Sequence, residues 1–146
     1  MSRPIIIKNT IGNFNKKILV DGDKSISIRF VLLASQAIGK SRAYNLLKSE
    51  DVISAINCLE KLGIKINWNK KKNFCEIYGN GLNGFNYKKK LTLNAGNSGT
   101  LGRCILGSLA RTPYKIKLIG DKSLSKRDFS RITKPLQDFG INFYPK

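Results

Sequence analysis

The chain has 146 residues, 41% of them hydrophobic, which is enough for one ordinary domain with a real core. No apolar run approaches the roughly 20 residues of a membrane span, and residues 1–4 lack a secretory signal, so we expect a cytoplasmic protein without a membrane partner. The three cysteines form no CxxC pair, which argues against a disulfide framework or a metal site and favours buried thiols.

The formal net charge is +18, which would suit a nucleic-acid partner. The excess is mostly lysine, however, in runs such as residues 70–72 and 88–90 that are typical of solvated turns. We expect a diffuse basic field that steers a small anionic substrate and no nucleic-acid partner, with a basic nucleic-acid-binding module as an alternative. Because the sequence has no histidine, proton transfer must use carboxylates, lysine, tyrosine or water.

Residues 5–8 and 17–20 read as short strands separated by a turn-prone segment at 12–15. A largely buried helix is then predicted from about residue 27 to 38, because this segment is apolar on nearly all sides. Gly39 is expected to stop it.

The stretch 21–29 joins the second strand to this helix and carries Lys24, Ser25 and Arg29. A helix N-terminus presents unpaired N–H groups and the positive end of the helix dipole, so cations there are unfavourable unless an anion is present. The stretch therefore predicts an anion site, with phosphate as the preferred ligand. The alternative is a Ser-capped helix with solvated Lys24 and Arg29.

A strand is predicted at residues 43–47, followed by a helix at 51–62 that Ser49 caps. Glu50 and Asp51 are interpreted as first-turn acids of this helix, although a catalytic role is the alternative. One apolar stripe is expected to face the core: Val52, Ile56, Leu59 and Leu62.

Residues 64–68 and 74–78 alternate around a turn and predict a β-hairpin. Beyond the hairpin, a strand at 91–93 leads through a glycine-rich turn into an apolar helix at 101–109.

Next comes a strand at 114–119. A helix is then predicted within 128–139, and Pro135 is expected to shorten or kink it. Residues 141–144 are predicted to form a last strand, and no return strand follows it. The pattern indicates two tandem βαβαββ units in a mixed α/β fold, the second incomplete, so we expect a truncated chain.

The predicted domain boundaries are residues 1–20 for strands of another globule, 21–93 for the first unit and 94–146 for the second.

The turn at the start of the second unit repeats the chemistry of stretch 21–29. Its polar and small residues are Asn97, Ser98, Gly99, Thr100 and Arg103. A second anion site is thereby indicated, although the segment matches neither a P-loop nor a dinucleotide fingerprint.

A third cationic cluster follows the strand at 114–119 and comprises Lys122, Lys126, Arg127 and Arg131. Arg127 and Arg131 would share one face if this segment is helical.

Three motifs, at residues 22–29, 96–103 and 120–127, resemble in order and spacing those of the EPSP synthase family, the 3-phosphoshikimate 1-carboxyvinyltransferases. The resemblance covers nearly the whole chain but about the first third of the family's usual length. It implies βαβαββ repeats in an inverse α/β barrel-like fold of two globules, with shikimate 3-phosphate and phosphoenolpyruvate bound between them. It also implies no metal or cofactor, and a monomer at full length.

The resemblance also implies roles for individual residues. Lys24 would contact both substrates and is the candidate catalytic residue, as a proton donor. Ser25 and Arg29 would bind shikimate 3-phosphate. Gly99 and Arg127 would bind phosphoenolpyruvate. The supporting residues of the second pocket would be Asn97, Thr100 and Arg103.

The expected activity is transfer of the enolpyruvyl group of phosphoenolpyruvate to the 5-hydroxyl of shikimate 3-phosphate. The complete enzyme would carry out this reaction, and this chain alone would be inactive. Ile28, Cys104 and Asp128 depart from the family pattern, and Asp128 is expected to weaken the positive field around Arg127. The related alternative is UDP-N-acetylglucosamine enolpyruvyl transferase. That family has Lys-Asn where this chain has Lys24-Ser25, and a catalytic cysteine that Cys104 does not match.

Overall fold

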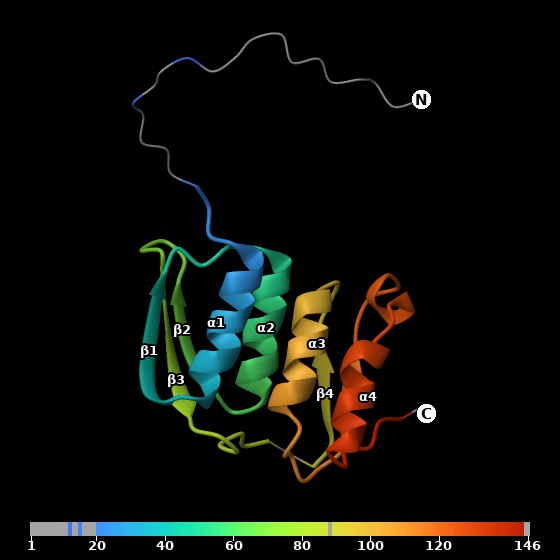
Figure 1. The fold of residues 1–146 in the computed structure, drawn as a ribbon. Helices are drawn as coiled ribbons and strands as arrows, with labels where there is room; N and C mark the ends of the chain where they lie inside the picture. Colours follow the sequence, from blue (N-terminus) through green and yellow to red (C-terminus); the bar gives the residue numbers. More distant parts are fainter. Residues whose placement is uncertain (1–11, 13–14, 16–19, 88, 145–146) are drawn as a thin grey trace, which may run out of the picture.

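The computed structural model describes residues 12, 15, 20–87 and 89–144, and shows a mixed α/β fold (Figure 1). The elements of the first half are α1 (Lys24–Gln36), β1 (Ile38–Tyr44), α2 (Glu50–Lys61), β2 (Lys65–Asn69) and β3 (Phe74–Asn80). Those of the second half are β4 (Leu91–Asn94), α3 (Gly99–Ser108), β5 (Ile116–Ile119), the short 3₁₀ helix η1 (Leu124–Lys126) and α4 (Ser130–Asp138). The strand predicted at 5–8 lies outside the described residues, as do residues 17–19 of the strand predicted at 17–20, and Val20 belongs to no strand.

The strands form two small sheets. The first has the order β1-β3-β2 with both pairs antiparallel, and the second pairs β4 with β5 in parallel. The predicted hairpin is confirmed as β2 and β3, with Trp68 opposite Cys75. No helix in the described part of the chain is long and apolar enough to cross a membrane.

Helix α1 packs against both α2 and α3, and all three helices begin at the same end of the molecule, the upper end in Figure 1. The segment between β5 and α4 lies at that end too. Because each helix carries partial positive charge at its N-terminus, this end of the molecule favours anions.

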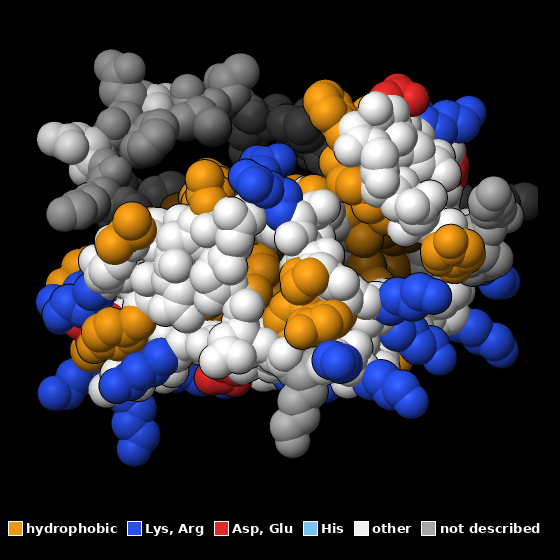
Figure 2. All heavy atoms as spheres, turned by 90° about the horizontal axis from the view of Figure 1, so that it is seen from below, with side chains coloured by type: hydrophobic (Ala, Val, Ile, Leu, Met, Phe, Trp, Pro, Cys, Tyr) orange, Lys and Arg blue, Asp and Glu red, His pale blue; other side chains and the backbone are white. Residues whose placement is uncertain are grey.

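One continuous apolar core joins the two halves, with Ile28 of α1, Leu59 of α2 and Leu101 of α3 fully buried. The predicted core stripe of α2 is confirmed, since its four residues are all buried. Helix α1 is less buried than expected, because Leu33 on its outer side is 70% exposed. On the face shown in Figure 2, lysine and arginine side chains are spread around the rim with hydrophobic side chains between them.

The structure corrects the boundary between α1 and β1. Helix α1 ends at Gln36, and Gly39, with φ of +89°, lies inside β1 and not at a helix stop. The strand predicted at 43–47 begins earlier, at Ile38. Lys40 and Arg42 are exposed, and the positions that alternate with them carry the small residues Gly39, Ser41 and Ala43, so the large apolar side chains by which a strand is recognised are missing.

Two further expectations differ from the structure. Residues 141–144 form no strand, because no described strand pairs with them and a strand exists only as part of a ladder. Cys58 and Cys75 are buried as expected, but Cys104 is exposed. The helix predicted within 128–139 is confirmed as α4, and Pro135 lies inside it.

Candidate anion-binding site at the helix N-termini

Helix α1 begins with a cap that fixes Lys24 at its first position. Asp23 is the N-cap, and its carboxylate accepts a 2.6 Å hydrogen bond from the backbone N–H of Ile26. The expected alternative of a serine cap is therefore wrong. Ser27 is buried instead, and its hydroxyl donates to the Asp23 carbonyl and accepts from the N–H of Leu47. These bonds attach the start of α1 to the connection between β1 and α2.

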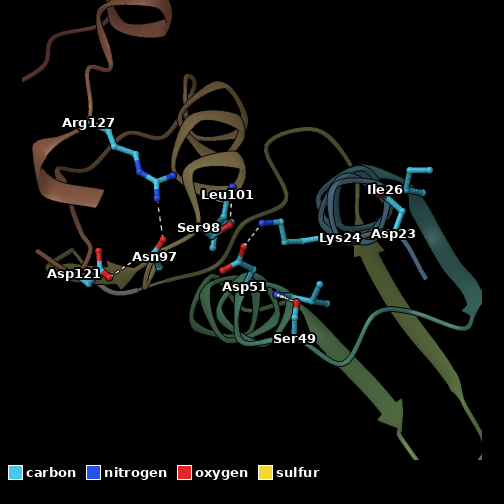
Figure 3. Close-up of polar contacts among 11 residues, drawn as sticks. Asp23, Lys24, Ile26, Ser49, Asp51, Asn97, Ser98, Leu101, Asp121 and Arg127 are labelled. Atoms are coloured by element: carbon cyan, nitrogen blue, oxygen red, sulfur yellow. Dashed lines mark hydrogen bonds and ion pairs between the residues drawn. The ribbon is translucent and has the colours of Figure 1, made fainter. Parts of the chain in front are cut away.

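Lys24 is held by an acid from the neighbouring helix. Its Nζ lies 3.1 Å from Oδ2 of Asp51, whose side chain is only 18% exposed (Figure 3). The predicted cap is also present, because Ser49 accepts from the N–H of Val52 at the start of α2. Asp51 is thus more than a first-turn acid: it joins the N-termini of α1 and α2 through Lys24.

Ser25 and Arg29 follow Lys24 along α1. Ser25 is half-buried and Arg29 is exposed in the second turn. Among the described residues no carboxylate forms an ion pair with Arg29. Ile28, one of the departures from the family pattern, is fully buried in the core, so its apolar side chain serves packing.

The start of α3 brings two guanidinium groups to one point. Ser98 caps this helix by accepting from the N–H of Leu101, and Gly99 is its first residue. A Cβ added to Gly99 would lie 2.6 Å from Nη1 of Arg127 and 3.1 Å from Nη1 of Arg103. A side chain at this position would therefore displace the guanidinium of Arg127 from the place it occupies at this helix N-terminus.

A hydrogen-bonded chain holds Arg127 in place. Its Nη2 donates to Oδ1 of Asn97 at 2.8 Å, and Nδ2 of Asn97 donates to Oδ2 of Asp121 at 2.5 Å (Figure 3). Hydrogen bonds from the backbone N–H of Leu124 and from Asn97 hold the pKa of Asp121 below its ordinary value. The sequence interpretation gave Asp121 no role of its own.

Arg103 is held from the other side. Its Nη2 donates to the backbone carbonyl of Asp128 at 3.1 Å, and its guanidinium lies over the ring of Phe129. The carboxylate of Asp128 accepts from the hydroxyl and N–H of Ser130, which lower the pKa of Asp128. Thr100 is half-buried at the second position of α3.

The structure separates part of the predicted third cluster. Arg127 has extended backbone geometry as the C-terminal cap of η1, whereas Arg131 belongs to α4, so the two do not share one helical face. Lys122 and Lys126 are exposed. In the part of the chain that the structure describes, no group of three or more histidine, cysteine, aspartate or glutamate side chains could hold a metal ion.

The geometry brings together Lys24 with Asp51 at one helix start, and Asn97, Arg103 and Arg127 around Gly99 at another. Such an arrangement binds small, multiply charged anions through charge-assisted hydrogen bonds and helix dipoles. Two acids hold the candidate ligand-binding residues in this arrangement. Asp51 was interpreted as a first-turn acid of α2, with a catalytic role as the alternative, and its contact with Lys24 was not predicted. Asp121 had no predicted role, and its only signal was its position in the turn that precedes Arg127.

Comparison with known proteins supplies the family context. A family model described as EPSP synthase (3-phosphoshikimate 1-carboxyvinyltransferase) matches residues 8–144. Two relatives named 3-phosphoshikimate 1-carboxyvinyltransferase, from Streptococcus pyogenes serotype M2 (strain MGAS10270) and serotype M1, are each 44% identical over 135 residues. That match covers 92% of this chain and 31% of each relative, so the chain spans about a third of their length.

A solved structure titled EPSP synthase from Acinetobacter baumannii is similar in fold as well as in sequence. It matches with a TM-score of 0.80 at 33% identity, covering 87% of this chain and 28% of that chain.

Proposed function

Because the chain belongs to the EPSP synthase family, we propose that it supplies part of the site in which phosphoenolpyruvate and shikimate 3-phosphate react. The enolpyruvyl group is transferred to the 5-hydroxyl of shikimate 3-phosphate, and phosphate is released. The domain boundaries at residues 20/21 and 93/94, a cytoplasmic location and a monomeric complete enzyme belong to the same proposal.

The observation that carries the proposal is the convergence of Arg103 and Arg127 at Gly99. Phosphoenolpyruvate carries a phosphate and a carboxylate next to each other, so its binding requires several donors within a small volume. Two guanidinium groups and the free N–H groups of the first turn of α3 supply such donors. In this proposal Arg127 and Gly99 line the phosphoenolpyruvate pocket, and Asn97, Thr100 and Arg103 shape it.

The start of α1 is proposed to bind the phosphate of shikimate 3-phosphate through Ser25 and Arg29. Lys24, at the first position of α1, is proposed to contact both substrates. Holding two anions side by side requires cations that offset their repulsion, and such preorganised charges also stabilise the transition state.

In the proposed chemistry the methylene carbon of phosphoenolpyruvate takes a proton while the 5-hydroxyl oxygen bonds to the neighbouring carbon and gives up its own proton to a base of the complete enzyme. The tetrahedral intermediate then loses a proton from the new methyl group and expels phosphate. Lys24 is the candidate donor of the first proton, because ammonium is a proton donor and no histidine is present.

Each alternative has less support. The family model and the relatives described above carry the name of the shikimate enzyme. For a nucleic-acid-binding module, the cations on the face in Figure 2 are spread around its rim and form no single stripe.

A chimera tests the proposal, because the chain spans about a third of its relatives. In it this chain replaces the matching third of the Streptococcus pyogenes relative, and phosphate release is measured. We expect release that requires both phosphoenolpyruvate and shikimate 3-phosphate, and none from the 146-residue chain alone. A folded chimera that releases no phosphate, or that accepts UDP-N-acetylglucosamine instead, would contradict the proposal.

A further inference from the structure

We propose that Asp121 is a positioning residue of the phosphoenolpyruvate pocket, whose carboxylate holds the Asn97 amide in the orientation that presents its oxygen to Arg127. This inference rests on the proposed function for the identity of the ligand. The hydrogen-bonded chain from Asp121 through Asn97 to Arg127 connects the turn before α3 with the turn after β5.

Asp121 is itself fixed by the backbone around it. Its N–H donates to the carbonyl of Gly96 at 2.8 Å, and its carbonyl accepts from the N–H of Ser125 at 2.9 Å. Its Oδ1 accepts from the N–H of Leu124 at 2.6 Å, which leaves Oδ2 for Asn97. A residue held by two bonds of its own backbone and one to its carboxylate provides a fixed reference for a side chain beside it.

The chemistry of the three groups allows one arrangement. A carboxylate only accepts hydrogen bonds and a guanidinium only donates them, whereas an amide has one donating end and one accepting end. Asn97 therefore satisfies Asp121 and Arg127 together only with its nitrogen toward Asp121. The reversed amide would place two acceptors against each other at Asp121 and two donors at Arg127.

This role predicts an effect opposite in sign to that of charge alone. A carboxylate near an anion site repels the anion, so removal of its charge should strengthen binding if charge is its only contribution. Loss of a positioning residue should weaken binding, because Arg127 loses its fixed orientation.

The substitution Asp121→Asn separates these two effects. An asparagine at this position has one acceptor oxygen for two donors, the N–H of Leu124 and the amide of Asn97, so one of them loses its partner. Asp128→Asn is the charge control: it removes the carboxylate of the residue that follows Arg127 in the chain, which contacts Ser130, and it leaves in place the backbone carbonyl that accepts from Arg103. Asn97→Ala breaks the chain while leaving the bond between Asp121 and Leu124 in place.

The experiment is a phosphoenolpyruvate titration of the ¹⁵N-labelled 146-residue chain, observed by NMR. We expect Asp121→Asn and Asn97→Ala each to weaken binding by about tenfold, and the double variant to be no weaker than either single variant. Asp128→Asn should leave binding unchanged or slightly stronger. In the ligand-free chain, the side-chain resonances of Asn97 and Arg127 should shift in Asp121→Asn and not in Asp128→Asn.

Binding that is unchanged or stronger in Asp121→Asn, or losses that multiply in the double variant, would overturn the inference. If Asp121→Asn does not fold, unchanged binding by Asn97→Ala would overturn it equally. If the unsubstituted chain does not bind phosphoenolpyruvate, the proposed pocket fails, and the ligand-free resonances still decide the role of Asp121. If Arg127→Ala loses binding while Asp121→Asn and Asn97→Ala do not, the pocket stands and this inference fails.

Discussion

At the scale of single residues, the site depends on side chains at the first turns of two helices. Lys24, Arg29 and Gly99 were predicted from sequence as parts of anion sites because the chemistry of a helix start is local, so unpaired N–H groups, glycine and cations within a few residues indicate such a site. The role of Arg127, the C-terminal cap of η1, was predicted only from the family resemblance. The pairing of Asp51 with Lys24 could not be predicted, because the two lie 27 positions apart and meet only when α1 packs on α2.

Gly99→Ala is expected to weaken phosphoenolpyruvate binding to the 146-residue chain by about tenfold, because the new methyl group displaces the guanidinium of Arg127. Isothermal titration calorimetry measures the change. Gly107→Ala, in the same helix, is the control: a Cβ there meets nothing within 4 Å. It should leave affinity unchanged and stabilise α3 by about 0.5–1 kcal/mol. Equal affinities for all three proteins would remove Gly99 from the pocket.

Lys24→Ala in the chimera is expected to lower kcat/KM by about 100-fold or more, because a charge-assisted contact with both substrates is lost. Lys61→Ala removes the same charge at the opposite end of α2, where Nζ donates to the carbonyl of Thr92, and should change kcat/KM little. Steady-state kinetics under identical conditions compare the two. Equal values for both variants would exclude Lys24 from the reaction.

At the scale of elements, short-range pattern decided which segments were predicted correctly. The stripe of α2, its Ser49 cap and the β2–β3 hairpin follow from local periodicity and turn residues, and all three are confirmed. The start of β1 was missed because the positions that alternate with Lys40 and Arg42 carry Gly39 and Ser41 and no large apolar residue. Lys40 and Arg42 pair instead with Glu76 on β3, 34 residues beyond Arg42. Such a pairing leaves no local signal.

Ser49→Ala is expected to destabilise the chain by about 1 kcal/mol, because the N–H of Val52 loses its capping acceptor. Urea unfolding followed by circular dichroism measures the free energy of unfolding. Ser123→Ala serves as the control, since Ser123 precedes η1 without a side-chain capping bond and should cost less than about 0.5 kcal/mol. A cost for Ser49→Ala no larger than the control's would show that the cap does not stabilise α2.

Glu76 should make stability depend on pH. Hydrogen bonding to Arg42, and to a lesser extent to Lys40, lowers the pKa of Glu76 below its ordinary value. A lowered folded-state pKa means that the stabilisation is fully present above the unfolded-state pKa and is lost as pH falls through the folded-state pKa. From about pH 7 to about pH 3, the unsubstituted chain should therefore lose more unfolding free energy than Glu76→Gln. Parallel urea curves for both proteins across this range would contradict the expectation.

At the scale of the whole molecule, the three parallel helices α1, α2 and α3 direct their N-termini to one end. The candidate ligand-binding residues lie at that end (Figures 1 and 3). The mixed α/β fold and the family were identifiable from sequence, because three motifs resemble those of the family in order and spacing. The close approach of Arg103 to Arg127 could not be predicted from sequence, since it depends on how the segment after β5 folds back over α3.

The most direct test of the anion site is a titration of the ¹⁵N-labelled chain with phosphoenolpyruvate, with sulfate as the reference anion. We predict shifts confined to residues 97–103 and 127 and to the start of α1, tighter binding of phosphoenolpyruvate than of sulfate, and loss of this preference in Arg127→Ala. Shifts spread over the lysine runs at 70–72 and 89–90, with equal affinity for both anions, would show a diffuse basic surface and contradict the account.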